Sequence, residues 1–295
     1  ITSRGLGDVY KRQIYENISS LLTAAIEKRI SVADVPVGVL LSGGLDSSLI
    51  TAISKEYKNN LNTYSIGFET INNEEGNEFH YSDMVANDLK TLHEKYSVTS
   101  FDLLNSLDDV IMSMSEPMFS QDSSAFYLLA KNVSKSAKVV LSGQGADEVF
   151  GGYFWYERIM NETDLNSIDT LSKYYFDRSY DNFKTIVHSD FVNENYASNE
   201  IGSRLKQMDP SLSILDKIFR LELSMFIIDD PVKRVDNMTM SHSLEARVPF
   251  LDIDLISFML SVKSEKKIEN GEKCLLKEVS NCLLYTSDAA DELCS

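Results

Sequence analysis

The stretch of sequence that most constrains the fold is an apolar segment that runs into a pair of glycines and then into a helical pattern. Residues 37–41, Val-Gly-Val-Leu-Leu, predict a buried strand, and residues 42–48 read Ser-Gly-Gly-Leu-Asp-Ser-Ser. Apolar residues at helical spacing continue from Leu49. The sequence therefore predicts a strand, a tight turn and the N-terminus of a helix, in that order.

This predicted turn is chemically suited to an anion. Gly43 and Gly44 let the backbone approach a ligand closely. The first N–H groups of the following helix lack intrahelical partners, and the helix dipole favours negative charge there. A purely structural strand-turn-helix is the alternative, because short glycine motifs are weak evidence by themselves. The serines and the aspartate around the glycines favour the anion site.

A second stretch repeats this pattern. Residues 138–143 predict another buried strand that ends at Ser142 and Gly143, and the acidic residue Asp147 follows. Ligands of open α/β sheets bind at the carboxyl ends of the strands, so the two loops are expected to face one site. Asp46 and Asp147 then become candidate ligands of a phosphate-bound Mg²⁺, which proteins hold through one or two carboxylates. Alternatively, the glycines serve turns and Asp147 caps a helix.

Strand and helix patterns alternate over the first half of the chain and not over the second. Further strands are predicted at residues 61–68, 93–99 and 138–143, and helices at 14–30, 80–89, 101–114 and 124–137. We therefore predict an α/β fold with a Rossmann-like parallel sheet over residues 14–152. Residues 153–281 are predicted to form a mostly helical region packed on that sheet.

A third stretch combines methionines with a charged pair. Met238, Met240 and Leu244 have near-helical spacing, so we expect them in the core rather than at a ligand site. Glu245 and Arg247 are predicted to form a structural charge pair at the end of a helix, which a following proline stops.

Both ends of the chain resemble translated sequencing adapter. Residues 8–13, Asp-Val-Tyr-Lys-Arg-Gln, can be encoded by a DNA string whose reverse complement, read one base in, encodes Cys-Leu-Leu-Tyr-Thr and the start of a Ser codon. Residues 282–287 are Cys-Leu-Leu-Tyr-Thr-Ser. Two strands of one DNA element at the two ends indicate adapter rather than protein. We therefore expect residues 1–13 and 282–295 to be artefacts and leave them out of the fold prediction.

The composition excludes several classes of protein. A formal net charge of −17 argues against sequence-independent binding to nucleic acid or to an anionic membrane, because both depend on basic surfaces. Hydrophobic residues make up 43% of the chain, as in globular proteins, and no apolar run approaches the length of a membrane span. Between the two expected adapter segments Cys274 is the one cysteine, which suits a reducing cytoplasm.

Three motifs together resemble a known family. Residues 42–48 resemble the pyrophosphate loop (PP-loop) of the ATP-pyrophosphatases and lack the Gly-Lys-Ser/Thr of a Walker A loop. Residues 141–153, LSGQGADEVFGGY, and residues 234–252, RVDNMTMSHSLEARVPFLD, follow in order. In this order and spacing they resemble the C-terminal synthetase domain of the glutamine-hydrolysing asparagine synthetases, over residues 14–281. The resemblance implies the adenine-nucleotide α-hydrolase type of α/β fold.

The resemblance also implies roles for the matching residues. The residues implied for the adenosine and α-phosphate are Leu40, Ile66, Ser142 and Gly143. Those implied for the pyrophosphate are Ser42, Gly43, Gly44, Ser47 and Ser48. Asp46 and Asp147 would contact Mg²⁺, and Lys273 would stabilise the phosphates of ATP and the charge of the acyl-adenylate transition state. Asp46, Asp147 and Lys273 are thus the implied catalytic residues.

The implied reaction is ATP-dependent adenylation of aspartate, followed by amidation with ammonia. In the intact enzyme, which is expected to be a cytoplasmic homodimer, the ammonia comes from glutamine through an N-terminal glutaminase domain. We expect this fragment to lack that domain. Some members carry a glutamate at the position of Gln144 and an arginine near Gln121. A synthetase acting on another carboxylate, such as a β-lactam-forming or peptide-cyclising enzyme, and a non-catalytic nucleotide-binding fragment are the alternatives.

Overall fold

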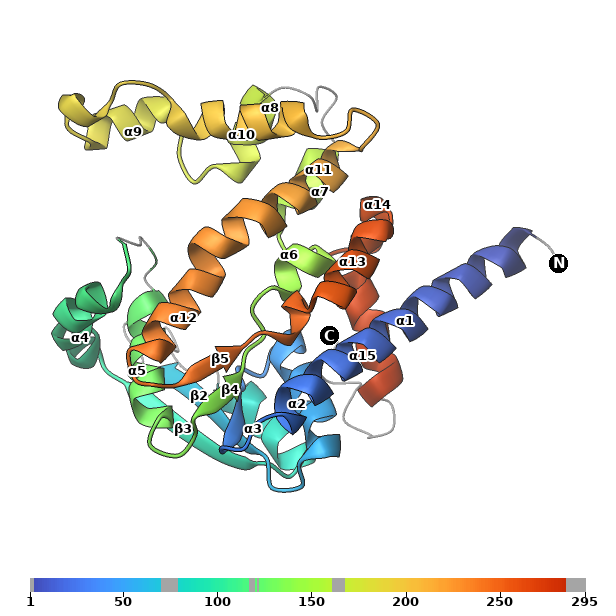
Figure 1. The fold of residues 1–295 in the computed structure, drawn as a ribbon, viewed down its shortest axis with the longest axis vertical. Helices are drawn as coiled ribbons and strands as arrows, with labels where there is room; N and C mark the ends of the chain where they lie inside the picture. Colours follow the sequence, from blue (N-terminus) through green and yellow to red (C-terminus); the bar gives the residue numbers. More distant parts are fainter. Residues whose placement is uncertain (1–2, 70–78, 117–119, 121, 161–167, 285–295) are drawn as a thin grey trace.

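The computed structural model describes residues 3–69, 79–116, 120, 122–160 and 168–284 (Figure 1). At its centre lies a parallel sheet of five strands in the order β3-β2-β1-β4-β5. The strands are β1 (Val37–Leu40), β2 (Asn62–Phe68), β3 (Leu92–Val98), β4 (Val139–Leu141) and β5 (Glu245–Arg247). The predicted α/β fold with a Rossmann-like parallel sheet is confirmed.

The strand order reverses direction beside β1. From β1 the chain first builds outward through β2 to β3, and it then returns to the other side of β1 with β4. Val37 of β1 is paired with Val139 of β4, so these two strands end at the same level. In a parallel sheet, such a switch point leaves a crevice at the carboxyl ends of the two strands. Both predicted Ser-Gly loops begin there.

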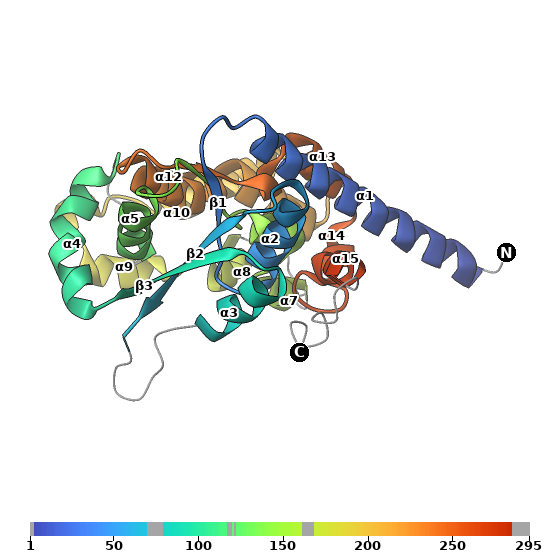
Figure 2. The same ribbon diagram turned by 90° about the horizontal axis from the view of Figure 1, so that it is seen from below.

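Helices cover both faces of the sheet (Figure 2). Val39 and Leu141 belong to a core cluster with α1 (Ser3–Ser31), α2 (Leu45–Tyr57), α13 (Ile253–Ser261) and α15 (Cys274–Leu284), and α1 and α15 lie side by side in both views. Leu40 and Val140 belong to another cluster with α5 (Asp122–Val133). The side chains of successive strand residues therefore point to opposite faces of the sheet, as in any pleated strand.

The second half of the described chain is largely helical, as predicted, but its irregular elements were not predicted. α11 (Ile214–Leu221) continues through the π-helical turns η2 (Glu222–Phe226) and η3 (Ile228–Val232) into α12 (Lys233–Met240). Pro231 lacks a backbone N–H to donate, which fits the irregular hydrogen bonding there. The remaining helices are α3 (Phe79–Asp88), α4 (Ser100–Ser113), α6 (Ala146–Phe150), α7 (Trp155–Met160), α8 (Ile168–Tyr175), α9 (Tyr180–Ile186), η1 (Ser189–Phe191), α10 (Tyr196–Gln207), η4 (Pro249–Leu251) and α14 (Ser264–Lys267). Figure 1 shows α8, α9 and α10 as a layer of their own, away from the sheet.

The fifth strand corrects the prediction for residues 245–247. Glu245 and Arg247 form the predicted ion pair at 2.8 Å, but they lie on β5 rather than at the end of a helix. Three residues are too few to show an alternating pattern, and it is main-chain pairing with β4 that makes them a strand. Met238 and Leu244 are buried as predicted, whereas Met240 is exposed, which contradicts the expectation that it belongs to the core.

The helices at the two ends of the described chain extend across the boundaries predicted for the adapter segments. Residues 13 and 14 both lie within α1, and α15 continues past residue 281 to Leu284. Among the described residues, no helix has both the length and the apolar character that crossing a membrane requires.

The first helix is tied to the end of the sheet by a buried carboxylate. Asp252 accepts a hydrogen bond of 2.8 Å from Nη1 of Arg29 and one of 3.2 Å from the N–H of Asp254, which caps α13. Arg247 of β5 donates to the carbonyl of Arg29. Burial acts to raise the pKa of Asp252, but the bonds from Arg29 and Asp254 outweigh it and lower that pKa.

We expect Asp252→Ala to lower the free energy of unfolding by about 2–3 kcal/mol, because it removes a helix cap and leaves Arg29 partly buried without its carboxylate. Urea unfolding at neutral pH measures this change. Asp254→Ala removes an exposed acidic residue from the same helix turn and is the matched control, with an expected cost below about 1 kcal/mol.

The difference in the free energy of unfolding between wild type and Asp252→Ala should also depend on pH. Because folding lowers the pKa of Asp252, its contribution is fully present above the ordinary carboxyl pKa and is lost as the pH falls through the lowered value. Equal stability losses for the two variants at neutral pH would contradict the role given to Asp252.

Candidate functional site

The two Ser-Gly loops meet at a cleft of about 280 Å³ above the carboxyl ends of β1 and β4. This confirms the expectation that both loops face one site. The predicted site residues that line the cleft are Leu40, Ser42, Gly44, Asp46, Ser47, Ile66, Ser142, Gly143 and Asp147. Gly43, Ser48 and Lys273 do not line it.

The first loop owes its shape to a glycine and a serine. Gly43 has φ +88°, and a Cβ there would lie 2.5 Å from Cβ of Tyr81 and 2.6 Å from the backbone nitrogen of Ser82, so no other residue fits. Oγ of Ser47 donates to the carbonyl of Gly44 at 3.2 Å and lies 3.0 Å from Oγ of Ser42. These bonds hold the turn closed over the start of α2.

Two of the residues implied for the pyrophosphate, Gly43 and Ser48, contact neighbouring elements rather than the cleft. Gly43 packs against the first turn of α3, as its contacts with Tyr81 and Ser82 show. Ser48 is buried in the first turn of α2, and its Oγ has no hydrogen-bond partner among the described residues.

Lys273 joins the two aspartates of the predicted site. Its Nζ lies 2.7 Å from Oδ2 of Asp46 and 2.8 Å from Oδ1 of Asp147. Its own backbone, with φ +52°, donates a hydrogen bond of 3.1 Å to the carbonyl of Gly151. We call Asp46, Asp147 and Lys273 the ion triad. It unites α2, α6 and the loop before α15.

Burial and charge act against each other in the ion triad. Burial acts to lower the pKa of Lys273, but Asp46 and Asp147 together outweigh it and hold that pKa above its ordinary value. Burial raises the pKa of Asp46, although Lys273 opposes the shift. Lys273 is therefore a fixed positive charge at the edge of the cleft.

The triad has the donor atoms for Mg²⁺ only in part. Oδ1 of Asp46 is buried and has no hydrogen-bond partner among the described residues, so it can accept a cation. Asp147 supplies a second carboxylate beside it. Within the described parts of the chain, no group of three or more His, Cys, Asp or Glu residues could hold a metal ion. Mg²⁺ would thus take its other ligands from phosphates and water, as it commonly does.

Several cleft residues were missed at the sequence level. Tyr64 and Ser65 line the cleft from β2, and Phe126 and Leu129 line it from α5, together with Leu41. Phe126 and Leu129 are three residues apart on one helix face, a spacing that also describes any buried helix. Gln144 lines the cleft as well, whereas Gln121 lies outside the described residues.

The comparison with known proteins agrees with the three motifs. Residues 17–284 match the asparagine synthase family. The chain belongs to this family. It is 30% identical to asparagine synthetase [glutamine-hydrolyzing] 3 of Bacillus subtilis, over 91% of this chain and 46% of that protein. For asparagine synthetase [glutamine-hydrolyzing] 1 of the same organism the identity is 28%, over 84% of this chain and 44% of that protein.

This member of the asparagine synthase family thus spans about half the length of the curated relatives it matches. Among solved structures it is similar to the U34-tRNA thiolase NcsA of Methanococcus maripaludis, with a TM-score of 0.37 and 12% identity over 95% of this chain and 77% of that one. It is also similar to an NH3-dependent NAD synthetase of Campylobacter jejuni, with a TM-score of 0.35 and 14% identity over 74% of this chain and 95% of that one.

Gly152 leaves room for the side chains of Asp147 and Lys273, and a residue with a Cβ would collide with both. A Cβ at Gly152 would lie 1.9 Å from Oδ1 of Asp147 and 2.2 Å from Cε of Lys273. We therefore expect Gly152→Ala to lower the free energy of unfolding by about 1–3 kcal/mol through overpacking. Gly202 lies in α10, and a Cβ there would meet no atom within 4 Å beyond its own helix backbone and chain neighbours. Gly202→Ala should instead stabilise by about 0.5–1 kcal/mol. Urea unfolding of both variants measures the contrast, and equal effects would contradict it.

Proposed function

We propose that this domain binds ATP with Mg²⁺ in the cleft and uses it to adenylate aspartate, which ammonia then converts to asparagine. The observation that carries the proposal is the ion triad beside a glycine loop at the switch point of the sheet. Membership of the asparagine synthase family and relatives named glutamine-hydrolysing asparagine synthetases support it. In the whole protein, the ammonia would come from glutamine in a part outside this chain.

The chemistry requires activation because a carboxylate is a poor electrophile. A carboxylate oxygen of aspartate attacks the α-phosphorus of ATP, and the bond to the bridging oxygen of pyrophosphate breaks. Ammonia then attacks the carbonyl carbon of the mixed anhydride, loses a proton, and AMP leaves. Both steps develop negative charge on phosphate oxygens, so fixed cations and oriented N–H groups lower their barriers.

The residues that line the cleft, together with Lys273 beside it, suit these steps. The backbone of the first loop and the N-terminus of α2 offer N–H groups for the pyrophosphate. Lys273 is held as a cation by two carboxylates and would stabilise charge on the phosphates. Asp46 and Asp147 would hold the Mg²⁺, which supplies further positive charge for the phosphates when bound. Gln144 lines the cleft but cannot act as a base, so the proton that ammonia loses after its attack would pass to water.

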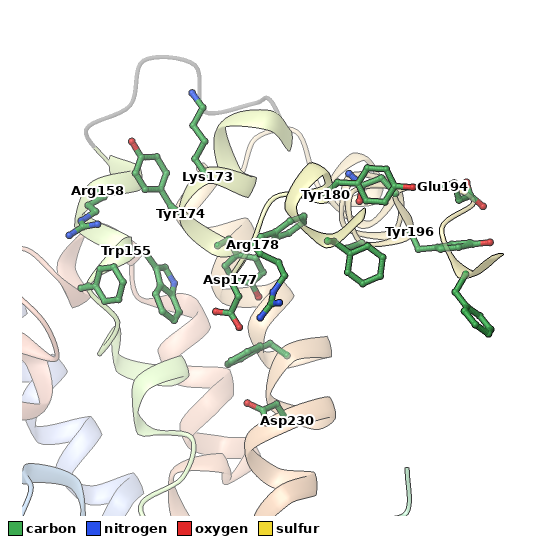
Figure 3. Close-up of a pocket in the computed structure, with 18 residues that line it drawn as sticks. Trp155, Arg158, Lys173, Tyr174, Asp177, Arg178, Tyr180, Glu194, Tyr196 and Asp230 are labelled. Carbon is green, nitrogen blue, oxygen red and sulfur yellow. The ribbon is translucent and has the colours of Figure 1, made fainter. Parts of the chain in front are cut away.

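A second cavity lies in the helical region, and no residue that lines it also lines the cleft. This cavity has a volume of about 900 Å³, and aromatic side chains such as Trp155 and Tyr174 line it together with Arg158 and Arg178 (Figure 3). A synthetase that acts on a carboxylate other than aspartate is the second candidate function, because the adenylation chemistry proposed for the cleft is the same for any carboxylate. Exchange of radioactive pyrophosphate into ATP, assayed with a panel of carboxylates, separates the two candidates.

We expect the protein, expressed from its full open reading frame, to exchange pyrophosphate into ATP when aspartate is present. Lys273→Ala should lower the kcat of exchange by about 10²–10³-fold, the effect of removing one fixed donor to a transition-state oxyanion. Lys277 is exposed one turn further along α15, so Lys277→Ala is the matched control and should retain activity. Chelation of Mg²⁺ should abolish exchange.

Two outcomes would contradict the proposal. Absence of exchange with every carboxylate would rule out adenylation. Tight ATP binding without turnover, unchanged in Lys273→Ala, would instead indicate a nucleotide-binding protein without catalysis.

A further inference from the structure

A buried carboxyl group stands directly beside the ion triad and has no role in the chemistry above. Glu148 follows Asp147 on α6 and is 1% exposed. Its Oε1 accepts a hydrogen bond of 2.7 Å from the hydroxyl of Tyr153. Burial raises the pKa of Glu148, and the bond from Tyr153 opposes the shift. A buried acid with a specific partner calls for an explanation, because burying a carboxyl group costs free energy.

The turn after α6 is held by contacts at Gly151, Gly152 and Tyr153. The carbonyl of Gly151 accepts the backbone N–H of Lys273 at 3.1 Å. Gly152 lies against Oδ1 of Asp147 and Cε of Lys273 so closely that it has no room for a side chain. Tyr153 is attached to α6 through Glu148. The same short turn therefore contacts both the lysine and one aspartate of the ion triad.

Tyr153 also connects this turn with the helical region. Its ring stacks on Trp155 at a centroid distance of 4.1 Å. Nε1 of Trp155 donates a hydrogen bond of 3.3 Å to Glu222, which is fully buried and also accepts a bond from the hydroxyl of Tyr156. Burial raises the pKa of Glu222 to about 8. Trp155 lines the cavity of the helical region (Figure 3), so Tyr153 contacts both a residue of that cavity and Glu148, the neighbour of Asp147 on α6.

We propose that Glu148 and Tyr153 are positioning residues that hold Lys273 in place between Asp46 and Asp147. α6 has only five residues, and so short a helix is not stable without contacts to its surroundings. The Tyr153–Glu148 hydrogen bond ties α6 to the turn whose Gly151 carbonyl accepts the backbone N–H of Lys273. The effect on catalysis rests on the proposed function, whereas the effect on the ion triad does not.

The kinetic test compares variants that differ in one hydrogen bond. Tyr153→Phe keeps the ring and loses the hydroxyl, and we expect it to lower the kcat of exchange about tenfold while the KM for ATP stays within about twofold, as for an interaction used in the transition state. Glu148→Ala should have the same effect. Glu148→Gln keeps an oxygen that accepts the bond from Tyr153 and should restore kcat to within about threefold of wild type.

Tyr175→Phe is the matched control. Tyr175 lies in the same aromatic cluster, and its buried hydroxyl has no hydrogen-bond partner among the described residues. Its removal should leave kcat and KM unchanged. Equal effects of Tyr153→Phe and Tyr175→Phe would overturn the proposal.

A double-mutant cycle tests the positioning without any activity. Unfolding equilibrium constants are measured by urea denaturation for Tyr153→Phe, Lys273→Met and the double variant. If Tyr153 acts on Lys273, the double effect should differ from the product of the single effects by more than about threefold, because coupled residues are not additive. For Tyr175→Phe combined with Lys273→Met, the effect on the unfolding equilibrium constant should equal the product of the two single effects.

The two tests separate the two proposals. Coupling of Tyr153 with Lys273 in a protein that shows no exchange would contradict the proposed function and support the positioning role. Exchange in the wild type, combined with a multiplicative cycle for Tyr153 and Lys273, would overturn the positioning role.

Discussion

The bridge that Lys273 makes between Asp46 and Asp147 is the interaction on which the site depends. It joins three segments that are far apart in the sequence, and two of them follow neighbouring strands. One lysine between two carboxylates leaves one negative charge in surroundings that are largely buried. Such an arrangement persists only if its charges remain paired, because an unpaired buried charge is costly. The triad therefore both closes the fold around the cleft and holds a cation at its edge.

The sheet explains why these segments can meet. Parallel strands end at one edge, and the reversal of strand order beside β1 leaves that edge open between β1 and β4. β5 adds to the other side of β4, and Ser142 donates its N–H to the carbonyl of Arg247 at 2.9 Å. The second Ser-Gly loop is thus supported by a strand from the helical half of the chain. Residues on both sides of the predicted boundary at residue 153 build one site.

The sequence allowed the parallel sheet and the two loops to be predicted because their signals are local. Short apolar strands followed by glycines, such as the one before Gly43, are visible without any tertiary information. β5 was missed because its main-chain partners, not its side chains, make it a strand. Lys273 came only from the family resemblance, since one lysine near Asp46 in space has no local pattern. Glu148 and Glu222 look like surface acids in the sequence, and only packing shows that they are buried.

These buried acids give the helical region a part in the site. Each accepts a hydrogen bond from a tyrosine hydroxyl. Glu148 is bonded to Tyr153 and Glu222 to Trp155, and the rings of Tyr153 and Trp155 stack. Apolar side chains could fill the same space at less cost, so packing alone does not explain the two carboxyl groups. Hydrogen bonds have directions and fix one arrangement where apolar contacts allow several. A site that must fix the position of Lys273 between two aspartates to within about half an ångström gains from that property, which accounts for polar groups in the core behind it.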